Sequence, residues 1–405
     1  MKVPWQAWYG DIEKELALAK GWRVNVASMA DAQEIHPRAI DQALSTPIGS
    51  RPLKELAEAS HRAAIAIEDI TRPGPTAQIL PRILAHLEAG GLGCERVRIV
   101  VGLGAHTPMR RPELLKKLGQ EALENVEVFQ NQPYENLEYL GESARGTPIF
   151  INRTFLDADL RIGVGTITPH SYAGFGGGAK VVAVGVAGMD TLEANHRRAR
   201  MGEAGGVGCV QGNQCRADLE EIAQAAGLGF VVNGVINSRR QLAGLFAGDM
   251  IGAHRAAVEC ARRVYATPLP SPADIAVFNA YPKDTDLLQS INALNVVCFD
   301  LSRAVRAGGS VVMTSACPEG AGVHLLEGPG MRGYVAYDQH RDFGGFDLII
   351  YSPNLAGPEA RQIYPRGTLL FNHWPEVIEE LQRRHGQSAS VTVFPCASLQ
   401  IPASG

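Results

Sequence analysis

Short apolar runs alternate with helical segments along most of this chain of 405 residues. Residues 97–101 and 158–164 are apolar runs that end near glycine or proline, as buried parallel strands often do. Between them, residues 112–123 show helical spacing of apolar side chains, and residues 218–226 show it again further along. This alternation predicts an α/β fold with mainly parallel sheets.

A proline-rich segment suggests where one domain ends. Pro268, Pro270 and Pro272 stiffen the chain, and a new series of strands and helices begins after them. Further strands are predicted at 274–279, 310–314, 347–351, 368–371 and 391–394, and an amphipathic helix at 375–384. We therefore expect two α/β domains, residues 1–268 and a smaller one of residues 269–405, with a ligand cleft between them.

Composition and charge exclude several classes of partner. The formal net charge of −4 predicts no nucleic-acid surface, which would need a clustered basic face. No apolar run approaches the roughly 18 residues that a membrane span requires. The seven cysteines form no CxxC pair and no zinc spacing, and the first residues lack the apolar core of a signal peptide. We expect a cytoplasmic protein with reduced thiols.

The stretch from His170 to Lys180 contains four glycines. Glycine permits positive φ and close backbone approach, so the stretch indicates a loop that holds a bulky cofactor. It is not a phosphate-binding P-loop, because Val181 follows the lysine where serine or threonine is required. No dinucleotide-binding glycine pattern is completed either. Beside the apolar run that follows, Lys180 would be partly desolvated and nucleophilic, although a lysine at a surface turn fits equally well.

Three histidines and one charged pair are candidates for chemistry. His106 and His170 follow predicted strands, where parallel sheets bind ligands, and imidazole exchanges protons near neutral pH. Loop closure by hydrogen bonding is the alternative for each. Arg72 offers a planar fork for a carboxylate or phosphate, and Asp69 could orient it or cap the next helix. His196 could bind a metal through a ring nitrogen, although a solvent-facing helix position is the default.

Four motifs follow one another along the N-terminal domain: DITRP at 69–73, GLGAHTP at 102–108, PHSYAGFGGGAK at 169–180 and EANH at 193–196. In order and spacing they resemble the nickel-dependent lactate racemase family. The resemblance implies a pyridinium pincer nucleotide that holds nickel through two sulfurs and a ring carbon. It also implies cofactor-biosynthesis enzymes as partners that load this group.

The resemblance assigns a role to each candidate residue. Lys180 would attach the cofactor as a thioamide, His196 would be the protein ligand to nickel, and His106 and His170 would be paired acid/bases. Further contacts to the cofactor or substrate are implied for Asp69, Thr71, Arg72, Gly176, Gly177 and Gly178, with Arg72 facing the substrate. The implied reaction is inversion of C2 of a 2-hydroxy acid by proton-coupled hydride transfer through a planar 2-keto acid.

The C-terminal domain would complete the substrate site, and it departs from the family there. Gln289 fits the pattern, whereas Leu288 stands where lactate racemase has tyrosine and Asn292 where it has lysine. Loss of the cation changes carboxylate recognition, so we expect a 2-hydroxy acid with a side chain other than that of lactate as the preferred substrate. Two alternatives are a metal-independent lyase or isomerase that uses the same histidine pair, and a nucleotide-binding protein without catalysis.

Overall fold

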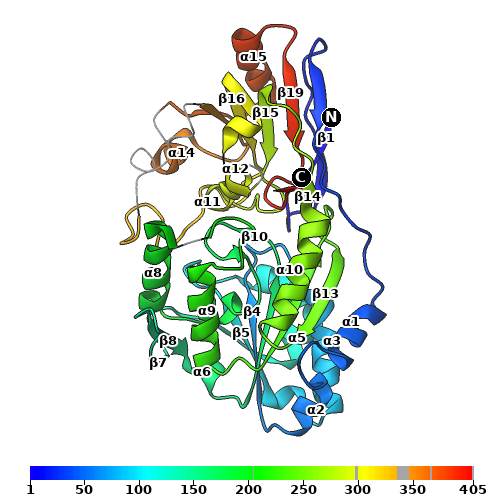
Figure 1. Ribbon diagram of the computed structural model, residues 1–405, viewed down its shortest axis with the longest axis vertical. Coiled ribbons are helices and arrows are strands. Elements are labelled where there is room, and N and C mark those ends of the chain that lie inside the picture. Colours follow the sequence, from blue (N-terminus) through cyan, green and yellow to red (C-terminus); the bar gives the residue numbers. More distant parts are fainter. Residues whose placement is uncertain (204, 297–299, 335–345, 365–366, 404–405) are drawn as a thin grey trace. The chain divides into compact units, whose positions relative to one another are not determined.

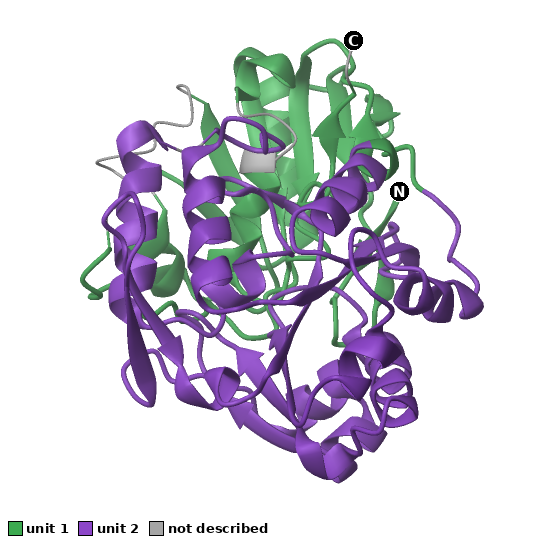
Figure 2. Cartoon of the chain, turned by 60° about the horizontal axis from the view of Figure 1, so that its bottom comes forward, with its two compact units in different colours: residues 1–31, 263–405 green, residues 32–262 purple. Residues whose placement is uncertain are grey.

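The computed structural model describes residues 1–203, 205–296, 300–334, 346–364 and 367–403. The chain divides into two compact units, which we call the central unit (Ala32–Arg262) and the flanking unit (Met1–Asp31 with Arg263–Gly405) (Figure 2). This division differs at the N-terminus from the expected domains of residues 1–268 and 269–405. The reason is strand pairing, because β3 (Arg23–Val26) lies parallel to β19 (Ser390–Phe394) in the sheet of the flanking unit.

The central unit is built on a six-stranded sheet with the order β13-β12-β9-β4-β5-β6, parallel except for the β12–β13 pair. Its strands are β4 (Ala63–Glu68), β5 (Val97–Gly102), β6 (Glu127–Gln130), β9 (Leu160–Thr166), β12 (Phe230–Ile236) and β13 (Leu242–Gly248). Two short antiparallel pairs are β7 (Leu137–Glu142) with β8 (Pro148–Asn152) and β10 (Pro169–His170) with β11 (Gly174–Phe175).

Helices cover this sheet, and α9 and α10 lie in front of it in Figure 1. The helices are α1 (Arg38–Ser45), α2 (Leu53–Glu58), α3 (Thr76–Ala89), α4 (Arg111–Leu118), α5 (Gln120–Asn125), α6 (Arg153–Leu156), α7 (Lys180–Ala183), α8 (Met189–Arg198), α9 (Gln214–Ala225) and α10 (Gly252–Tyr265). Every residue of β4 is buried, which matches the apolar sequence AAIAI and a strand covered on both faces.

The flanking unit contains a second six-stranded sheet, entirely parallel, with the order β18-β17-β16-β15-β19-β3. The other strands of this sheet are β15 (Ala273–Asn279), β16 (Val305–Thr314), β17 (Asp347–Tyr351) and β18 (Leu369–Phe371). Two short pairs lie outside the sheet: β1 (Lys2–Trp5) pairs with β2 (Ile12–Glu15), and β14 (Ala266–Thr267) pairs with β20 (Ile401–Pro402). Its helices are α11 (Leu287–Ser290), α12 (Asn292–Val296), α14 (Gly357–Ile363) and α15 (Trp374–His385).

Both faces of this second sheet are buried. Along β15, Ala276 and Phe278 join one apolar cluster, whereas Ile275 and Val277 join another on the opposite face. Such two-sided burial is the reason why the parallel strands read as continuous apolar runs. The predicted α/β fold with mainly parallel sheets is confirmed.

One local expectation needs correction. The helix expected at 112–123 is two helices, because Gly119 has a φ of +81° and separates α4 from α5.

The described residues bear on two further expectations, which concern membrane-spanning segments and the state of the cysteines. Among the helices of those residues, none is both long and apolar enough to cross a bilayer. Six cysteines in the described ranges are free thiols, and Cys298 lies outside those ranges.

Candidate functional site

The candidate site residues of the central unit follow the carboxyl ends of three neighbouring strands, β4, β5 and β9. The end of β4 is tied to the end of β9 through one carboxylate. Glu68 accepts a hydrogen bond from the backbone N–H of Thr166 (2.9 Å) and another from its hydroxyl. Because β4 lies between β5 and β9, the loops that leave these strands share one edge of the sheet.

Asp69, directly after β4, pairs with His106 in the loop after β5. The carboxylate oxygen Oδ2 lies 2.5 Å from Nδ1 of the imidazole, and Asp69 is 3% exposed. Burial alone would raise the pKa of Asp69, but the His106 contact and the charge of Arg72 hold it well below its usual range. An ionised Asp69 fixes the His106 proton on Nδ1, so the lone pair of the imidazole lies on Nε2.

Thr71 completes this turn and connects it to Arg72. Its hydroxyl and its backbone N–H donate to Oδ1 of Asp69, at 2.5 and 2.8 Å. The Nη1 group of Arg72 in turn donates to the Thr71 hydroxyl (2.9 Å). Arg72, Thr71, Asp69 and His106 therefore form one hydrogen-bonded group, which the sequence motif alone could not show.

Lys117 on α4 is hydrogen-bonded to this turn. Its ammonium group donates to Oε1 of Glu68 (3.2 Å), to the carbonyl of Arg72 (2.9 Å) and to the carbonyl of Gly74 (3.2 Å). The side chain is completely buried, and this burial lowers the pKa of Lys117 although the Glu68 carboxylate opposes the shift. The sequence analysis did not single out Lys117, because it stands in the amphipathic helical stretch ELLKKL beside an exposed lysine.

The glycine-rich loop needs its glycines for its own packing. Gly174, Gly177 and Gly178 have φ values of +72°, +67° and +55°, which other residues rarely adopt. A Cβ on Gly177 would lie 2.6 Å from Cδ1 of Ile167, and one on Gly178 would lie 2.8 Å from Cδ2 of His254. All of these glycines are buried. Contacts of Gly176–Gly178 with a cofactor therefore stay a prediction, and internal packing already accounts for their lack of side chains.

Arg216 on α9 shapes this loop from the interior. It is 1% exposed and donates to the carbonyls of Ala173 (3.3 Å), Phe175, Gly176 (3.4 Å) and Gly177 (3.4 Å). Burial lowers its pKa to about 10, so the group stays cationic at neutral pH. One buried guanidinium thus contacts four backbone carbonyls between Ala173 and Gly177.

His170 and His196 share an aromatic neighbour, Tyr172. The Tyr172 ring lies 6.1 Å from that of His170 and 5.5 Å from that of His196, edge-on in both cases. Nδ1 of His170 accepts hydrogen bonds from the backbone N–H groups of Tyr172 and Ala173, both at 3.2 Å. A neutral His170 therefore carries its proton on Nε2.

The orientation of His196 suits a metal ligand. On α8, its Nδ1 lies 2.7 Å from the carbonyl oxygen of Leu192, which can only accept a hydrogen bond. The proton is thus on Nδ1 and the lone pair on Nε2, the arrangement in which a second partner orients a metal-binding imidazole. Within the described ranges, no group of three or more His, Cys, Asp or Glu side chains could hold a metal ion.

Lys180 is the first residue of α7 and is partly exposed. The loop that carries His106 packs closely against the end of α7. The N–H of Gly104 donates to the carbonyl of Gly185 (3.0 Å), and a Cβ on Gly102 would lie 2.9 Å from Cα of Gly185. This close backbone contact requires glycine on both segments.

The predicted residues of the flanking unit surround α11. Asp286 caps this helix by accepting from the backbone N–H of Gln289 (2.9 Å), and Gln289 is 9% exposed. The side-chain amide of Asn292 donates to the Gln289 carbonyl (2.7 Å). Leu288 packs against the apolar core of this unit. These three residues are contiguous in structure and belong to a different unit from Arg72.

Sequence reasoning also missed two polar residues behind the glycine-rich loop. Asn233 lies in the buried strand FVVNGVI and accepts from the backbone N–H of Gly178 (2.8 Å). His254 on α10 is 1% exposed, with Nε2 at 3.0 Å from the Gly176 carbonyl. The available signal was the asparagine itself, because an amide inside an apolar strand must find a partner.

Comparisons with known proteins relate this chain to lactate racemases. The sequence model of the lactate racemase N-terminal domain matches residues 9–207. The lactate racemase of Lactiplantibacillus plantarum is 29% identical over 395 residues, 88% of each chain. That of Thermoanaerobacterium thermosaccharolyticum is 30% identical over 288 residues, 70% of this chain and 66% of the relative.

Solved structures show the same fold. The lactate racemase apoprotein of Thermoanaerobacterium thermosaccharolyticum has a TM-score of 0.78 at 21% identity and covers both chains completely. A protein from Thermotoga maritima has a TM-score of 0.67 at 17% identity, over 92% of this chain and all of its own. At these identities the structural likeness supports the fold and not the substrate.

Proposed function

This chain belongs to the lactate racemase family, and from that premise we propose that it inverts C2 of a 2-hydroxy acid other than lactate with a nickel pincer nucleotide as cofactor. Its relatives are isomerases, and racemase or epimerase activity follows for this chain. The observation that best supports the finer proposal is that Nδ1 is engaged on both His106 and His170, which leaves Nε2 of each to exchange a proton.

The two histidines supply the base and the acid that inversion needs. With its proton held on Nδ1 by Asp69, a neutral His106 offers the lone pair of Nε2 and can accept the C2 hydroxyl proton. On His170, Nδ1 faces two backbone N–H groups, so Nε2 is the nitrogen that would exchange a proton with the substrate oxygen, and His170 would act as the acid from its imidazolium form. One inversion would leave His106 as the imidazolium and His170 neutral, which is the acid–base pair that inversion of the other enantiomer needs.

Lys180 and His196 are proposed to hold the cofactor. Lys180 would form the covalent link, and Nε2 of His196 would be the protein ligand to nickel, since Nδ1 is committed to the Leu192 carbonyl. The absence of a three-residue metal group among the described side chains is compatible with a metal that arrives with its own ligands. When bound, the cofactor supplies a reversible acceptor for the hydride of C2.

Arg72 is proposed to bind the substrate carboxylate. Its guanidinium is oriented by Thr71, and its backbone is held by Lys117, so its rotamer freedom is already reduced. Gln289 would contribute a hydrogen bond from the flanking unit. Leu288 is apolar, and the amide of Asn292 is directed to a backbone carbonyl, so this segment lacks the phenol and the ammonium of lactate racemase. A different side chain on the substrate follows from that loss.

The test is a panel of enantiopure 2-hydroxy acids incubated with cofactor-loaded protein, with racemisation followed by chiral chromatography. His106→Gln and His170→Gln should each lower the rate by about 10²-fold or more, because general acid–base catalysis contributes 10² to 10⁴. His61→Gln, at an exposed histidine, is the matched control and should leave the rate unchanged. Unchanged rates in both site variants would remove the proposed mechanism, and no interconversion of any acid would remove the substrate class.

A second measurement distinguishes the proposed nickel-dependent mechanism from the metal-independent alternative. Protein produced together with the cofactor-making enzymes should contain nickel and show a mass adduct on Lys180. His196→Ala should lose nickel while Lys180 keeps the adduct. Protein that racemises a substrate without either signature would favour a carbanion mechanism that uses the same histidine pair.

A further inference from the structure

One face of helix α8 is attached to its neighbours through two buried side chains. Thr191, in the first turn, donates its hydroxyl to the carbonyl of Pro148 (2.6 Å) and accepts from the backbone N–H of Phe150 (2.9 Å), both in β8. Asn195, four residues later, donates its side-chain amide to the carboxylate of Asp218 on α9 (2.9 Å). Residues four apart share one face of a helix, so the two contacts resist rotation of α8 about its axis.

The rotation of α8 determines the direction of His196. Successive residues of an α-helix point about 100° apart, so His196 projects away from the face that holds Asn195. Its ring lies edge-on to that of Tyr172, at 5.5 Å. A rotation of the helix would turn Nε2 of His196 through the same angle. Of the two contacts on α8, that of Asn195 is the closer to His196 along the chain.

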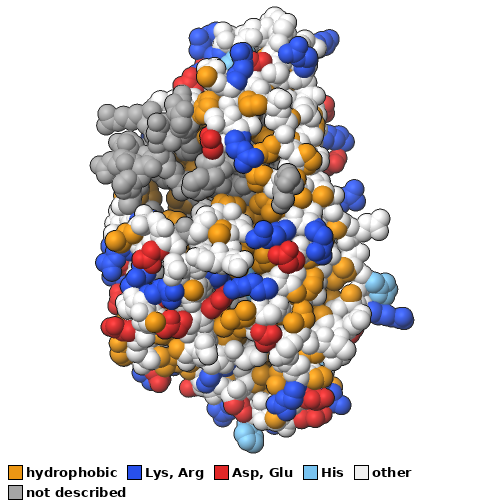
Figure 3. Space-filling model, in the orientation of Figure 1, with side chains coloured by type: hydrophobic (Ala, Val, Ile, Leu, Met, Phe, Trp, Pro, Cys, Tyr) orange, Lys and Arg blue, Asp and Glu red, His pale blue; other side chains and the backbone are white. Residues whose placement is uncertain are grey.

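Asp218 is a carboxylate with no exposed surface. Figure 3 shows charged side chains of both signs on the surface over α9 and α10, whereas Asp218 is completely buried. Its Oδ1 accepts from the Ser143 hydroxyl (2.5 Å), and its Oδ2 accepts from the Thr147 hydroxyl and the Asn195 amide, both at 2.9 Å. In the described part of the chain all three donors are neutral. Because a buried carboxylate needs such donors, Asp218 connects α8 and the turn between β7 and β8 to α9.

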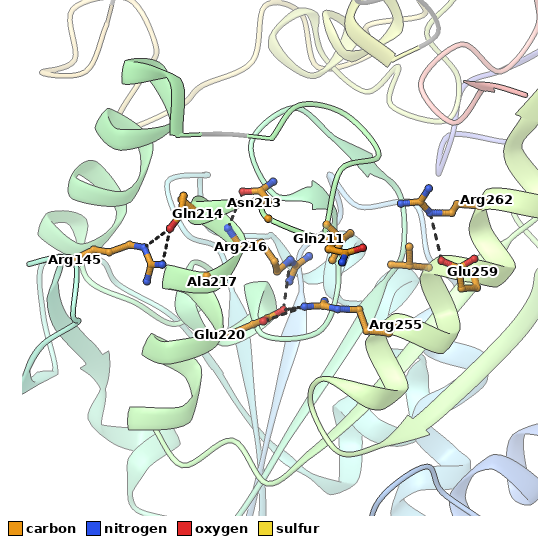
Figure 4. Close-up of a pocket in the computed structure, with 13 residues that line it drawn as sticks. Arg145, Gln211, Asn213, Gln214, Arg216, Ala217, Glu220, Arg255, Glu259 and Arg262 are labelled. Carbon is orange, nitrogen blue, oxygen red and sulfur yellow. Dashed lines mark hydrogen bonds and ion pairs between the residues drawn. The ribbon is translucent and has the colours of Figure 1, made fainter. Parts of the chain in front are cut away.

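Helix α9 also supports the loop that carries His170. Asn213 lies at the start of this helix and caps it by accepting from the backbone N–H of Arg216 (3.0 Å) (Figure 4). The Asn213 amide donates to the carbonyl of Tyr172 (2.8 Å). Asn213 and Asp218 therefore connect both the Tyr172 backbone and α8 to the same helix.

We propose that Asp218 is a positioning residue, which sets the rotation of α8 through the amide of Asn195 and so directs Nε2 of His196 toward the metal. The inference rests on the proposed role of His196 as the protein ligand to nickel. Apolar side chains would also hold two helices together. A hydrogen bond is directional, however, and therefore fixes the angle at which α8 packs.

The test compares two substitutions that each remove one donor from the same carboxylate. Asn195→Ala removes the donor on α8, and Ser143→Ala, the matched control, removes a donor in the β7–β8 turn. Heteronuclear NMR of the cofactor-free chain, with nitrogen-labelled histidine, follows the two ring nitrogens of His196. We expect the His196 signals to shift in Asn195→Ala and to stay unchanged in Ser143→Ala, although both variants lose stability.

A reversed pair tests the contact itself. Asn195→Asp with Asp218→Asn restores an amide and a carboxylate between the helices in the opposite direction, and the His196 signals should return to their parent positions. Signals that remain as in Asn195→Ala would overturn the proposal. Unchanged signals in Asn195→Ala would also overturn it, and so would equal shifts in Ser143→Ala, because general loosening would then explain the effect.

Cofactor-loaded protein gives a second readout. After dialysis against a chelator, Asn195→Ala should retain about tenfold less nickel than the parent chain, since groups that orient metal ligands contribute about 10- to 100-fold to affinity. The reversed pair should regain the nickel. A parent chain that binds no nickel would refute the proposed function, whereas the His196 signals of the cofactor-free chain would still test the role of Asp218.

Discussion

Replacement of Lys117 by methionine tests whether one buried ammonium group holds the turn that carries Asp69 and Arg72. Methionine has a similar length and volume, so little cavity is created and the change removes mainly the charge and its donors. Three acceptors lose their partner, namely the Glu68 carboxylate and the carbonyls of Arg72 and Gly74.

The expected loss of stability is large. Glu68 remains buried, at 7% exposed, and keeps only its two hydrogen bonds from Thr166. Removal of one partner from a buried ion pair costs about 3–5 kcal/mol, because the remaining charge has no compensation. Glu68→Gln in the same chain removes that charge, so the double variant should recover at least about half of the loss.

Urea denaturation followed by circular dichroism measures the difference through the transition midpoint. Lys116→Met, the same substitution at the exposed neighbouring residue, is the control and should change the free energy of unfolding by less than about 0.5 kcal/mol. A Lys117→Met protein as stable as this control would refute the reasoning, and so would a double variant less stable than Lys117→Met alone.

Three further predictions follow from the site. Asp69→Asn should slow racemisation by about 10²-fold or more, because His106 loses its orienting acceptor, and an unchanged rate in stopped assays would contradict this. The variant should also be less stable than the parent chain at neutral pH. This difference in stability should shrink as the pH falls below 3.8 towards the lowered pKa of folded Asp69, because the parent then loses the contribution of the ionised carboxylate. His254 takes up a proton near pH 6.5 in the unfolded chain, whereas in the folded chain its pKa is much lower. The free energy of unfolding should therefore decrease below pH 6.5, by up to about 1.4 kcal/mol per pH unit. His254→Gln should flatten this slope in urea titrations at about pH 5 to 7. Leu288→Tyr with Asn292→Lys should increase racemisation of lactate relative to the substrate preferred by the parent chain, and a decrease for lactate alone would argue against this segment as the specificity determinant.

Much of the fold could be predicted because strand and helix patterns are local. Residues 347–351 were expected as a strand and are β17, and residues 391–394 lie within β19. The positions of His106 and His170 after strands were equally visible. The sequence did not reveal that residues 1–31 belong to the flanking unit. Strand β3 has the exposed sequence RVNV, and its partner strand lies more than 360 residues further along the chain.

The sequence by itself determined which residues are available for chemistry, through ordered motifs and their places at the ends of apolar runs. Only the tertiary structure decided how those residues are used. Asp69 was expected near a cofactor, and the structure directs it to Nδ1 of His106. Lys117 and Arg216 read as ordinary helix residues, yet both are buried beneath the loops of the site. The physical reason is that periodicity records neighbours along one element, whereas hydrogen-bond partners depend on which strands become adjacent.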